Sequence, residues 1–415
     1  MAKDKLTDYD STASGNLDVG GISVAEGMLP SGVNNAIREQ MSHLADFAAG
    51  TSGVDVLKLQ DDTDTNSIKL QAPASVTATT TFTLPDGDGA SGQAMITDGA
   101  GTLSWAAPYG NRNLIINGAM QVAQRGTSAS ATNSYVSVDR YLTSIIGGGA
   151  FTLSQETDTP SGQGFKNSLK VTVDTADSSI AAGDYYVIQY RIEGQNVAHL
   201  MLGTSDAVKV TLSFWVKSSL TGNHGASLQN GASNRSYPFQ YNISTANTWE
   251  KITKTFQLDT SGTWLTTNGI GLKLMLDLGS GTTYQGTADA WGGANYHTAS
   301  SSVQLIATGS ATWYITGIQL EVGETATPFE HRSYGDELAR CQRYYEYGRI
   351  AQIDTPVITG SFVVLKRVAP TMTRLGNTWT TSEGGTFGPF DNNSYYVQSG
   401  GVNYVGGIWS ADAEL

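Results

Sequence analysis

The feature that most constrains the fold is a succession of short segments in which apolar and polar residues alternate. About nine such runs follow one another between residues 151 and 322, separated by turn-forming clusters rich in Gly, Ser, Thr and Asn. Alternation with a period of two places successive side chains on opposite faces of a β-strand. Because no helical pattern interrupts the series, residues 110–332 are expected to form one large β-sandwich.

The parity of the runs also predicts which strand faces form the core. Alternate residues are apolar from Val208 to Val216, from Tyr237 to Ile243 and from Ile270 to Leu278. Apolar side chains that share one face of a strand are the ones that a second sheet can cover. These three faces are therefore predicted to point into the sandwich.

Two tryptophans are predicted to lie on the polar faces of such strands. Trp215 shares its face with Lys217, and Trp249 lies opposite a face that contains Ile252. An exposed aromatic ring beside amide, hydroxyl and carboxylate groups is the surface that a sugar ligand requires. The alternative is that another layer of the chain, or a neighbouring subunit, covers both rings. Further candidates for ligand binding lie in turn-rich or C-terminal stretches: Trp264, Trp291, Tyr296, Tyr395 and Tyr396.

Residues 31–49 carry the clearest helical pattern near the N-terminus, with Ser31 as the expected N-cap and Gly50 as the expected stop. The apolar residues are spaced by four, three and four positions, which gives the narrow seam of a helix that pairs with identical helices. A helix of about five turns is marginal alone in water, so it needs partners. The alternative is an amphipathic helix lying on the β-structure of its own chain. The residues of this helix seam are Asn34, Ile37, Met41, Leu44 and Ala48.

The remaining chain divides into an arm, a shaft and a tip. Residues 51–109 hold short alternating runs between acidic and Gly-rich turns, and each run is too short to bury much apolar area. We expect a slender β shaft that intertwines with copies of itself, preceded by an arm that ends in the seam helix (residues 1–50). Residues 333–415 are expected to form a helix, capped by Ser333 and reaching residue 348, followed by a small β domain. The predicted buried stripe of that helix is Tyr334, Leu338, Cys341 and Tyr345.

Composition excludes several classes of function. The net charge is -13, whereas binding to nucleic acid through its phosphates needs a basic surface. No window approaches the roughly 18 apolar residues of a membrane-spanning helix, and the polar start of the sequence is no secretory signal, so we expect synthesis in a cytosol and no membrane insertion. One cysteine and five scattered histidines give no metal spacing. Without a nucleophile motif or a phosphate loop, no catalytic, metal or cofactor residue is assigned, and the chain is not expected to be an enzyme.

Three stretches resemble tail-fibre and related virion proteins of tailed bacteriophages and prophages. They are NRNLIINGAMQVAQRGTS with YVSVDRY within residues 111–141, ITGIQLEVGETATPFEHRSYGDELARCQRYYE at 315–346, and MLPSGVNNAIREQMSHLADF at 28–47. SFWVKSS is similar to the carbohydrate-binding-module-like jelly rolls found in such fibres. TDGAGTLSW resembles the short β-repeats of fibre shafts.

This resemblance implies a homotrimer, assembled in the cytoplasm of the bacterial host and mounted on the virion tail. The N-terminus would contact other tail proteins, and the helix seam would hold the three chains together. The jelly roll (110–332) and the distal tip (333–415) would recognise a glycan or a protein on the host cell surface. Two alternatives remain open. One is a structural tail protein, an adaptor or fibre support without receptor binding of its own, and the other is a polysaccharide depolymerase.

Overall fold

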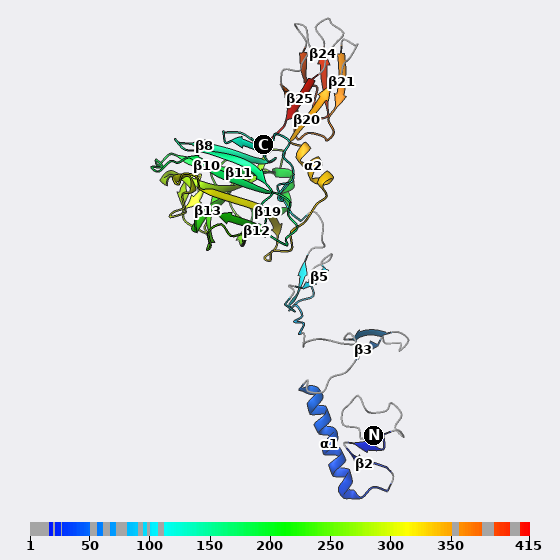
Figure 1. Cartoon of the computed structure of the whole chain (residues 1–415). Coiled ribbons are helices and arrows are strands. Elements are labelled where there is room, and N and C mark those ends of the chain that lie inside the picture. The colour runs from blue at the N-terminus through cyan, green and yellow to red at the C-terminus, as the bar shows by residue number, and fades with distance from the viewer. Residues whose placement is uncertain are drawn as a thin grey trace. The chain divides into compact units, whose positions relative to one another are not determined.

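The computed structural model describes residues 16–19, 21–25, 27–49, 56–60, 67–71, 81–89, 94–97, 100–106, 112–350, 357–375, 386–398 and 407–415. The chain divides into two compact units, residues 1–106 and 107–415 (Figure 1). The first part of the expected arm, residues 1–15, lies outside the described residues. The finer division of the chain into arm, shaft, jelly roll and tip stays a prediction.

The N-terminal unit contains a short antiparallel hairpin of β1 (Asp18–Val19) and β2 (Ile22–Ser23), which contacts α1 (Pro30–Ala48). The prediction that Ser31 caps this helix is wrong. Leu29 holds the N-cap position without a side-chain hydrogen bond, and Pro30 begins the helix. Proline suits this position because the first helical N–H has no partner within the helix and the ring fixes the required φ.

α1 buries one side and exposes the helix seam. Ala36 and His43 are buried, whereas Ile37, Met41 and Leu44 are 50%, 64% and 55% exposed. Within the described residues, the side that α1 buries is therefore not its apolar seam. The other seam and flanking residues are Asn34, Val33 and Phe47, which are exposed, and Ala48, whose side chain lies outside the described residues.

Two further antiparallel hairpins belong to this unit. β3 (Val56–Gln60) pairs with β4 (Ser67–Gln71), and β5 (Ala94–Thr97) pairs with β6 (Leu103–Ala106). In the part of the chain that the structure describes, each pair is a separate two-stranded sheet. An isolated two-stranded hairpin is marginally stable at best in water. That these strands intertwine with copies of the chain stays a prediction.

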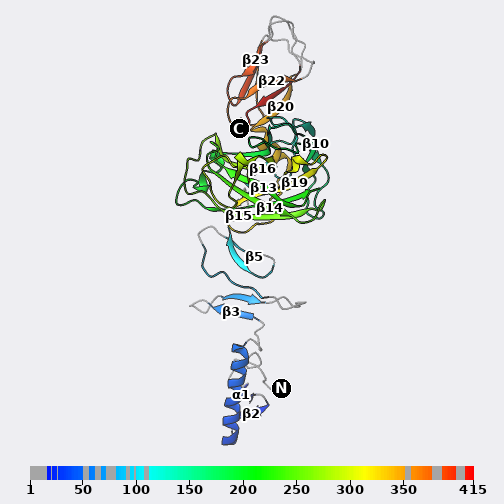
Figure 2. The ribbon, with the colours of Figure 1, turned by 90° about the vertical axis from the view of Figure 1, so that its left-hand side faces the viewer.

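Residues 128–322 contain an antiparallel sandwich of two sheets, so the mainly β fold predicted from the alternation is confirmed (Figure 2). One sheet has six strands in the order β15-β12-β19-β10-β9-β7, and the other has five in the order β14-β13-β16-β11-β8. The six-stranded sheet contains β7 (Ser128–Ser130), β9 (Ala150–Glu156), β10 (Ser168–Thr175), β12 (Lys209–Ser218), β15 (Glu250–Gln257) and β19 (Thr312–Val322). The five-stranded sheet contains β8 (Tyr141–Ile146), β11 (Tyr185–Glu193), β13 (Gly222–Gln229), β14 (Ser236–Ile243) and β16 (Ile270–Ser280).

The predicted core faces are confirmed. Val210, Leu212, Phe214 and Val216 on β12 are at most 1% exposed, and alternate residues of β14 and β16 belong to the same apolar cluster. Burial of one such side chain stabilises a fold by roughly 1.5–3 kcal/mol relative to its exposure. Because the strand pleat turns the intervening residues outward, this core decides which side chains lie on the outer faces of the sandwich.

Buried side-chain amides hold the segment before the first strand of the sandwich, residues 112–127. Asn113 bridges two main-chain groups of β19, at 3.0 Å and 3.1 Å. Asn117 has a left-handed backbone (φ 60°), and its N–H donates to the Glu337 carboxylate (2.6 Å). Asparagine tolerates this conformation better than most residues with a Cβ atom. The residues that carry the resemblance in this stretch therefore serve the scaffold.

α2 (Tyr334–Gln342) begins as predicted, because the Ser333 hydroxyl accepts a hydrogen bond from the N–H of Asp336 (3.2 Å). Cys341 is fully buried, and burial raises the pKa of its thiol. Tyr334 is 56% exposed, so its assignment to the buried stripe is wrong. Neither of the described α-helices is long and apolar enough to cross a membrane.

The predicted continuation of this helix to residue 348 is wrong. The chain instead enters β20 (Tyr345–Ile350), which pairs with β25 (Gly407–Asp412), and β22 (Thr371–Leu375) completes a three-stranded sheet. A second sheet has the order β21 (Val357–Ser361), β24 (Ser394–Gln398), β23 (Thr386–Pro389). The small core of this tip contains Phe362, Val397, Trp409 and Ala411.

Buried ion pairs join the tip to the sandwich. Glu414, which follows the last strand of the tip, pairs with Arg125 (3.3 Å) and with Arg140. Glu193, the last residue of β11, pairs with Arg343 (2.8 Å) just after α2. The side chains of Arg140, Glu193 and Glu414 are at most 5% exposed. These buried charges are stabilised by ion pairing with one another rather than by solvation.

Removing one member of this junction is expected to destabilise the C-terminal unit. In Glu414→Ala the Arg140 guanidinium stays buried without its carboxylate, and Arg125 keeps only its pair with Asp412, so the free energy of unfolding should fall by about 3–5 kcal/mol. The control is Glu324→Ala, which removes a solvent-exposed pair with Lys209 and should change that free energy by less than about 0.5 kcal/mol. Urea unfolding followed by tryptophan fluorescence measures both. Equally small effects would contradict a buried junction.

Candidate functional site

The aromatic residues predicted to bind a ligand fall in four places on the C-terminal unit. These are the outer face of the six-stranded sheet (Trp215, Trp249), the end of the core (Trp264, Trp291), a segment over the five-stranded sheet (Tyr296) and the tip (Tyr395, Tyr396). The surroundings of each place decide which rings a ligand can reach.

The outer face of the six-stranded sheet presents aromatic and lysine side chains in adjacent rows. In one row, Trp215 on β12 lies opposite Lys251 on β15. In the next row, Lys217 on β12 lies opposite Tyr314 on β19, which in turn lies opposite Lys170 on β10. Directly opposed residues have Cβ atoms about 4.5–5.5 Å apart, close enough for such long side chains to touch. The sheet register therefore assembles rings and amines at one place.

Trp249 joins these rows from the position just before β15. Its ring centroid lies 6.1 Å from that of Tyr314, close to edge-to-face, and its indole N–H donates to Asp158 Oδ1 (3.0 Å). The Lys217 ammonium lies 4.2 Å from the Tyr314 centroid and 5.3 Å from the Trp249 centroid, and it forms an ion pair with Asp158 Oδ2. The outer aromatic cluster is the name used below for Trp215, Trp249, Tyr314, Lys217 and Asp158.

The electrostatics of this cluster keep Asp158 ionised. Partial burial acts to raise the pKa of the Asp158 carboxyl, but hydrogen bonds from Lys217 and Trp249 outweigh it and lower the pKa below its usual value. The Lys170 ammonium lies 5.5 Å from the Tyr314 centroid and 3.8 Å from Glu156. The rings are half-buried and Asp158 is exposed. Such a surface can stack against a sugar ring and exchange charge-assisted hydrogen bonds with it.

Sequence reasoning missed Tyr314 and Asp158. The signal for Tyr314 was present, because Trp313 and Ile315 are core residues of β19 and the residue between them must face outward. Asp158 lies in the irregular connection between β9 and β10, where no periodicity predicts direction. Only the folded chain shows that it meets Lys217.

A second group of rings beside β19 was also missed. Gly317 has a left-handed backbone (φ 64°), and the Phe165 ring fills the space that a side chain at this position would need. The Phe165 centroid lies 5.0 Å from that of Phe329 and 5.2 Å from that of His331. These residues lie outside the regular strands, and no pattern in the sequence connects them.

Trp264 and Trp291 close one end of the core. Their ring centroids lie 5.5 Å apart, edge to face, and Trp291 lies 5.2 Å from Tyr237. The indole N–H groups donate to the main-chain carbonyls of Ser261 and Gln257, both at 3.0 Å. Both rings pack against the buried cluster of the sandwich. Because each ring packs on the core and each indole N–H is already hydrogen-bonded, these two side chains stabilise the fold and have no free donor for a ligand.

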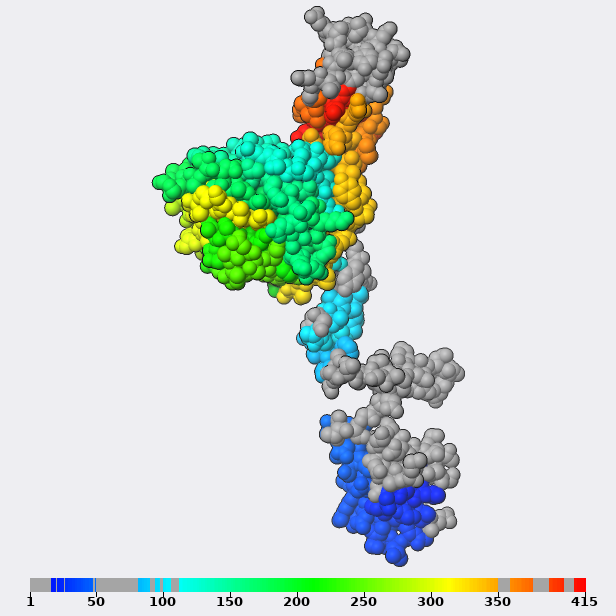
Figure 3. Space-filling model, viewed as in Figure 1, coloured from blue at the N-terminus to red at the C-terminus, as the bar shows by residue number. Residues whose placement is uncertain are grey.

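A covering segment, residues 281–304, lies over the outer face of the five-stranded sheet, at the surface of the sandwich (Figure 3). It includes the short parallel strands β17 (Gln285–Gly286) and β18 (Thr298–Ala299). Gly225 on β13 permits its approach, because the Thr298 hydroxyl occupies the place of a Cβ atom at residue 225. Tyr296 belongs to this segment, and its ring packs against two of the segment's own glycines.

Polar groups within and beneath the covering segment are buried, and their pKa values shift accordingly. Burial raises the pKa of Asp277 to about 7, although a hydrogen bond from Ser280 (2.6 Å) opposes the shift. Burial, assisted by the charge of Lys273, lowers the pKa of His297 to about 3. Burial also lowers the pKa of Lys273 to about 8. Among the described residues, no group of three or more His, Cys, Asp or Glu is placed to hold a metal ion.

The two tyrosines of the tip point to opposite faces of β24. The Tyr395 ring centroid lies 4.8 Å from that of Trp409, so Tyr395 packs against the small core. The Tyr396 centroid lies 4.9 Å from that of Phe390, which is 60% exposed. Of the two candidates, Tyr396 is therefore the one that remains near an exposed ring.

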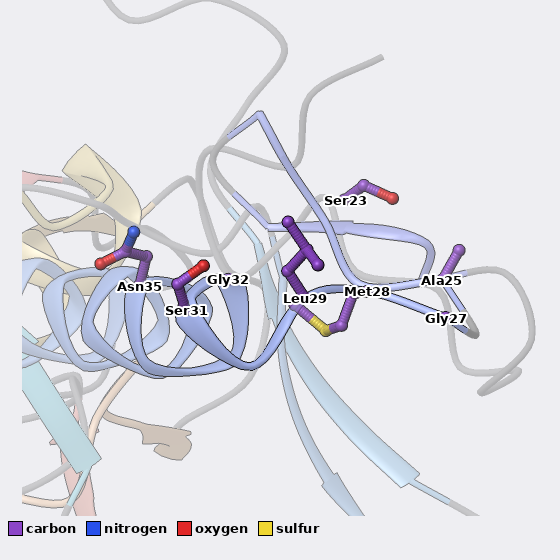
Figure 4. A pocket seen from close by; sticks show the side chains of 8 residues that line it. All are labelled: Ser23, Ala25, Gly27, Met28, Leu29, Ser31, Gly32 and Asn35. Carbon is purple, nitrogen blue, oxygen red and sulfur yellow. The ribbon is translucent and has the colours of Figure 1, made fainter.

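An open pocket lies at the start of α1 in the N-terminal unit. Figure 4 shows its lining, in which Met28 and Leu29 belong to the chain that enters the helix. The lining offers hydroxyl and amide groups but no charged side chain, so it has no chemistry that indicates catalysis. Its residues are Ser23, Ala25, Gly27, Met28, Leu29, Ser31, Gly32 and Asn35.

Comparisons with known proteins find distant structural likenesses. No family model and no curated protein sequence matches the chain. The chain is similar to the enzymatically active domain of tailspike protein 4 of bacteriophage CBA120, at 13% identity over 51% of this chain and 21% of that chain, with a TM-score of 0.27. The match thus spans about a fifth of the tailspike chain.

Carbohydrate-binding modules give likenesses of the same strength. The N-terminal cellulose-binding domain of β-1,4-glucanase C from Cellulomonas fimi matches at 13% identity over 49% of this chain and 100% of that chain, with a TM-score of 0.26. The family 11 module of the cellulase Lic26A-Cel5E from Clostridium thermocellum matches at 11% identity over 48% and 96%, with a TM-score of 0.25. At these TM-scores, the function of this chain must be argued from its own residues.

The different packing of the tryptophans predicts different effects on stability. Trp291→Ala opens the end of the core and should lower the free energy of unfolding by about 2–3 kcal/mol. Trp215→Ala removes a ring from a polar outer face and should lower it by about 1 kcal/mol or less. Urea unfolding of both variants measures the difference. A larger loss of unfolding free energy for Trp215→Ala than for Trp291→Ala would show that Trp215 is a core residue.

The buried carboxyl of Asp277 predicts a pH dependence of stability. Its pKa is about 7 in the folded chain and near 3.9 when unfolded, so its favourable contribution is present below about pH 4 and is lost as the pH rises through 7. Asp277→Asn has no such loss, so its stability relative to the wild type should increase by roughly 2–4 kcal/mol between pH 4 and pH 8. Thermal unfolding of both proteins across this range tests it. A constant difference at all pH values would show that Asp277 titrates normally.

Proposed function

We propose that the chain is a homotrimeric tail-fibre protein of a tailed bacteriophage, whose C-terminal unit binds a glycan on the host cell surface. The observation that carries this proposal is the outer aromatic cluster, where half-buried rings stand beside a lysine and an exposed carboxylate on a polar sheet face. The N-terminal unit would attach the fibre to other tail proteins of the virion.

The cluster has the components that sugar recognition requires. A pyranose ring presents apolar C–H faces, which stack on aromatic rings, and hydroxyl groups, which need hydrogen-bond partners. Trp215, Trp249 and Tyr314 supply the rings, and Lys217, which lies beside the Asp158 carboxylate, supplies a charged partner. Most of these residues lie on or beside strands whose other face is buried in the core, so the rings are positioned before any ligand arrives.

The charges of the cluster favour binding over hydrolysis. Glycoside hydrolysis uses a carboxylic acid that is protonated at working pH and a second carboxylate opposite it. Asp158 is held by Lys217 and Trp249, whose hydrogen bonds lower its pKa. Groups stabilised as carboxylates are poor general acids. The proposal therefore assigns no catalytic residue to this surface.

The N-terminal unit supports the proposed trimer through its exposed apolar surface. Half of the exposed large apolar side chains among the described residues belong to this unit, although it is the shorter of the two. The exposed row on α1 has the spacing of a coiled-coil seam, with Asn34 at a position where a polar residue can fix the register. The occupant that fits such a seam is the same helix from two further copies of the chain.

One observation keeps a structural tail protein as the second candidate. Exposed apolar residues also occur on the tip, where Val363 is 73%, Phe390 60% and Ile408 38% exposed. A partner chain that covers these residues would make the tip an assembly contact rather than a receptor-binding surface. The proposals differ in one result, because only a receptor-binding fibre attaches to host cells.

The helix seam predicts the effect of a charge at its centre. Leu44→Asp places three carboxylates in one apolar seam, so the protein should change from a trimer to a monomer. Ser42→Asp introduces the same charge at an exposed position of the same helix and should leave the trimer intact. Light scattering of the full chain measures the mass of each variant. A trimer of Leu44→Asp would contradict the proposed seam.

Attachment to the host cell tests the proposed binding surface. The full-length wild type should bind host cells saturably, and Trp215→Ala should bind at least about tenfold more weakly while keeping its circular dichroism spectrum. Fluorescently labelled protein titrated onto cells gives both affinities. A folded, trimeric wild type that ignores host cells would favour the structural tail protein instead.

A further inference from the structure

We infer that the outer aromatic cluster contains a carboxylate-binding site for an acidic sugar, and that the Asp158 side chain occupies this site in the free protein. The inference rests on the proposed function, because it names the class of glycan for the same surface. It follows from what surrounds the two oxygens of Asp158.

The Asp158 carboxylate is bound by two donors, the Lys217 ammonium and the Trp249 indole N–H, which together are called the carboxylate receptor below. Lys217 Nζ contacts Oδ2, and the Trp249 indole N–H donates to Oδ1 at 3.0 Å. The Tyr314 and Trp249 rings both lie beside this contact, with centroids 4.2 Å and 5.3 Å from the Lys217 ammonium. One cation and one N–H, each on its own oxygen, with rings alongside, would hold the carboxylate of a uronic acid in the same way.

The receptor is fixed, whereas its occupant is free to leave. The Lys217 side chain is 10% exposed and extends from β12, whose other face is part of the core. The Asp158 side chain is 49% exposed. The Asp158 main chain is held separately, since its carbonyl accepts from the Ser168 hydroxyl at 2.6 Å. The carboxylate can therefore leave by rotation about its side-chain bonds, without movement of the backbone.

The surrounding lysines make this face attractive to an anion. Lys170 lies one strand away from Tyr314, and Lys251 lies opposite Trp215. Among the described residues, Lys251 is exposed and has no ion pair. The net charge of the chain is -13, so the chain as a whole repels anions. An acidic sugar is attracted electrostatically by this local group of lysines, whereas a neutral sugar is not.

If Asp158 occupies the site, its removal changes the affinity for an acidic glycan in an unusual direction. A ligand that must displace an internal carboxylate binds more weakly, because its apparent affinity is the intrinsic affinity multiplied by the fraction of sites that are free. Removing Asp158 should therefore strengthen the binding of an acidic glycan. If Asp158 were itself the partner of a sugar hydroxyl, or only a surface ion pair, its removal would weaken binding or leave it unchanged.

The test uses the full-length protein on an array of bacterial surface polysaccharides that contain uronic acids, each in its native form and after reduction of its carboxyl groups. The wild type should bind native forms better than reduced ones. Asp158→Ala should bind native forms about threefold to tenfold more tightly than the wild type, and Lys217→Gln at least tenfold more weakly. The matched control is Asp174→Ala, an exposed residue of β10 bonded to Thr152, which changes the charge equally and should have no effect.

A second variant keeps the test decisive if Lys217→Gln does not fold. Trp249→Phe retains a ring but removes the N–H that contacts Oδ1, so it should weaken binding to native forms and not to reduced ones. Equal binding of both forms by the wild type, or no gain for Asp158→Ala over Asp174→Ala, would overturn the inference while leaving the proposed function in place. Binding to no polysaccharide, together with no attachment to host cells, would overturn both.

Discussion

Burial of alternate residues between the two sheets is the constraint on which the rest of the C-terminal unit depends. Once Phe214 and Val216 are in the core, Trp215 and Lys217 must face outward. The same rule turns Tyr314 outward between Trp313 and Ile315. Antiparallel pairing then brings Lys217 and Tyr314 to one register position. A slip of one residue would exchange both faces at once, so the register of the core also preserves the proposed recognition surface.

The same ion-pair chemistry serves two purposes, and burial decides between them. At the junction between sandwich and tip, Arg140 and Glu414 are both withdrawn from water, so neither can be removed without leaving a buried charge. In the outer aromatic cluster, Lys217 is similarly enclosed but Asp158 is half exposed. An exposed partner costs little to displace, because water takes its place. The first arrangement holds two parts of the chain together, and the second leaves a charged receptor that a ligand can enter.

Much of the fold could be predicted from the sequence because it follows from local periodicity. The faces of β12, β14 and β16 were read from alternation, and the start of α2 from Ser333, since both signals lie within a few residues. The end of α2 was missed because Tyr345–Ile350 pairs with a strand more than fifty residues later, and tertiary pairing overrides helical pattern. The N-cap of α1 differs from the prediction because Pro30 occupies the first helical position, which moves the cap from Ser31 to Leu29.

The site was predictable only in part, for the same reason. Trp215 and Trp249 could be placed on outer faces by parity, but their partner Asp158 comes from an irregular loop. The role of Trp291 as a lid of the core and the place of Tyr296 in the covering segment depend on long-range contacts that leave no periodic trace. Sequence patterns therefore predict which aromatic residues are candidates for ligand binding. Contacts between distant segments decide which of these rings pack in the core and which a ligand can reach.

The central claim, that a glycan binds at the outer aromatic cluster, is tested most directly by ¹⁹F NMR of the protein labelled with 5-fluorotryptophan. The chain has eight tryptophans, and single Trp→Phe substitutions assign their resonances. Addition of host surface polysaccharide should shift the resonances of Trp215 and Trp249 and leave those of Trp264, Trp291 and Trp409 in place. Shifts confined to Trp409 in the tip, or to Trp264 and Trp291, would contradict the account.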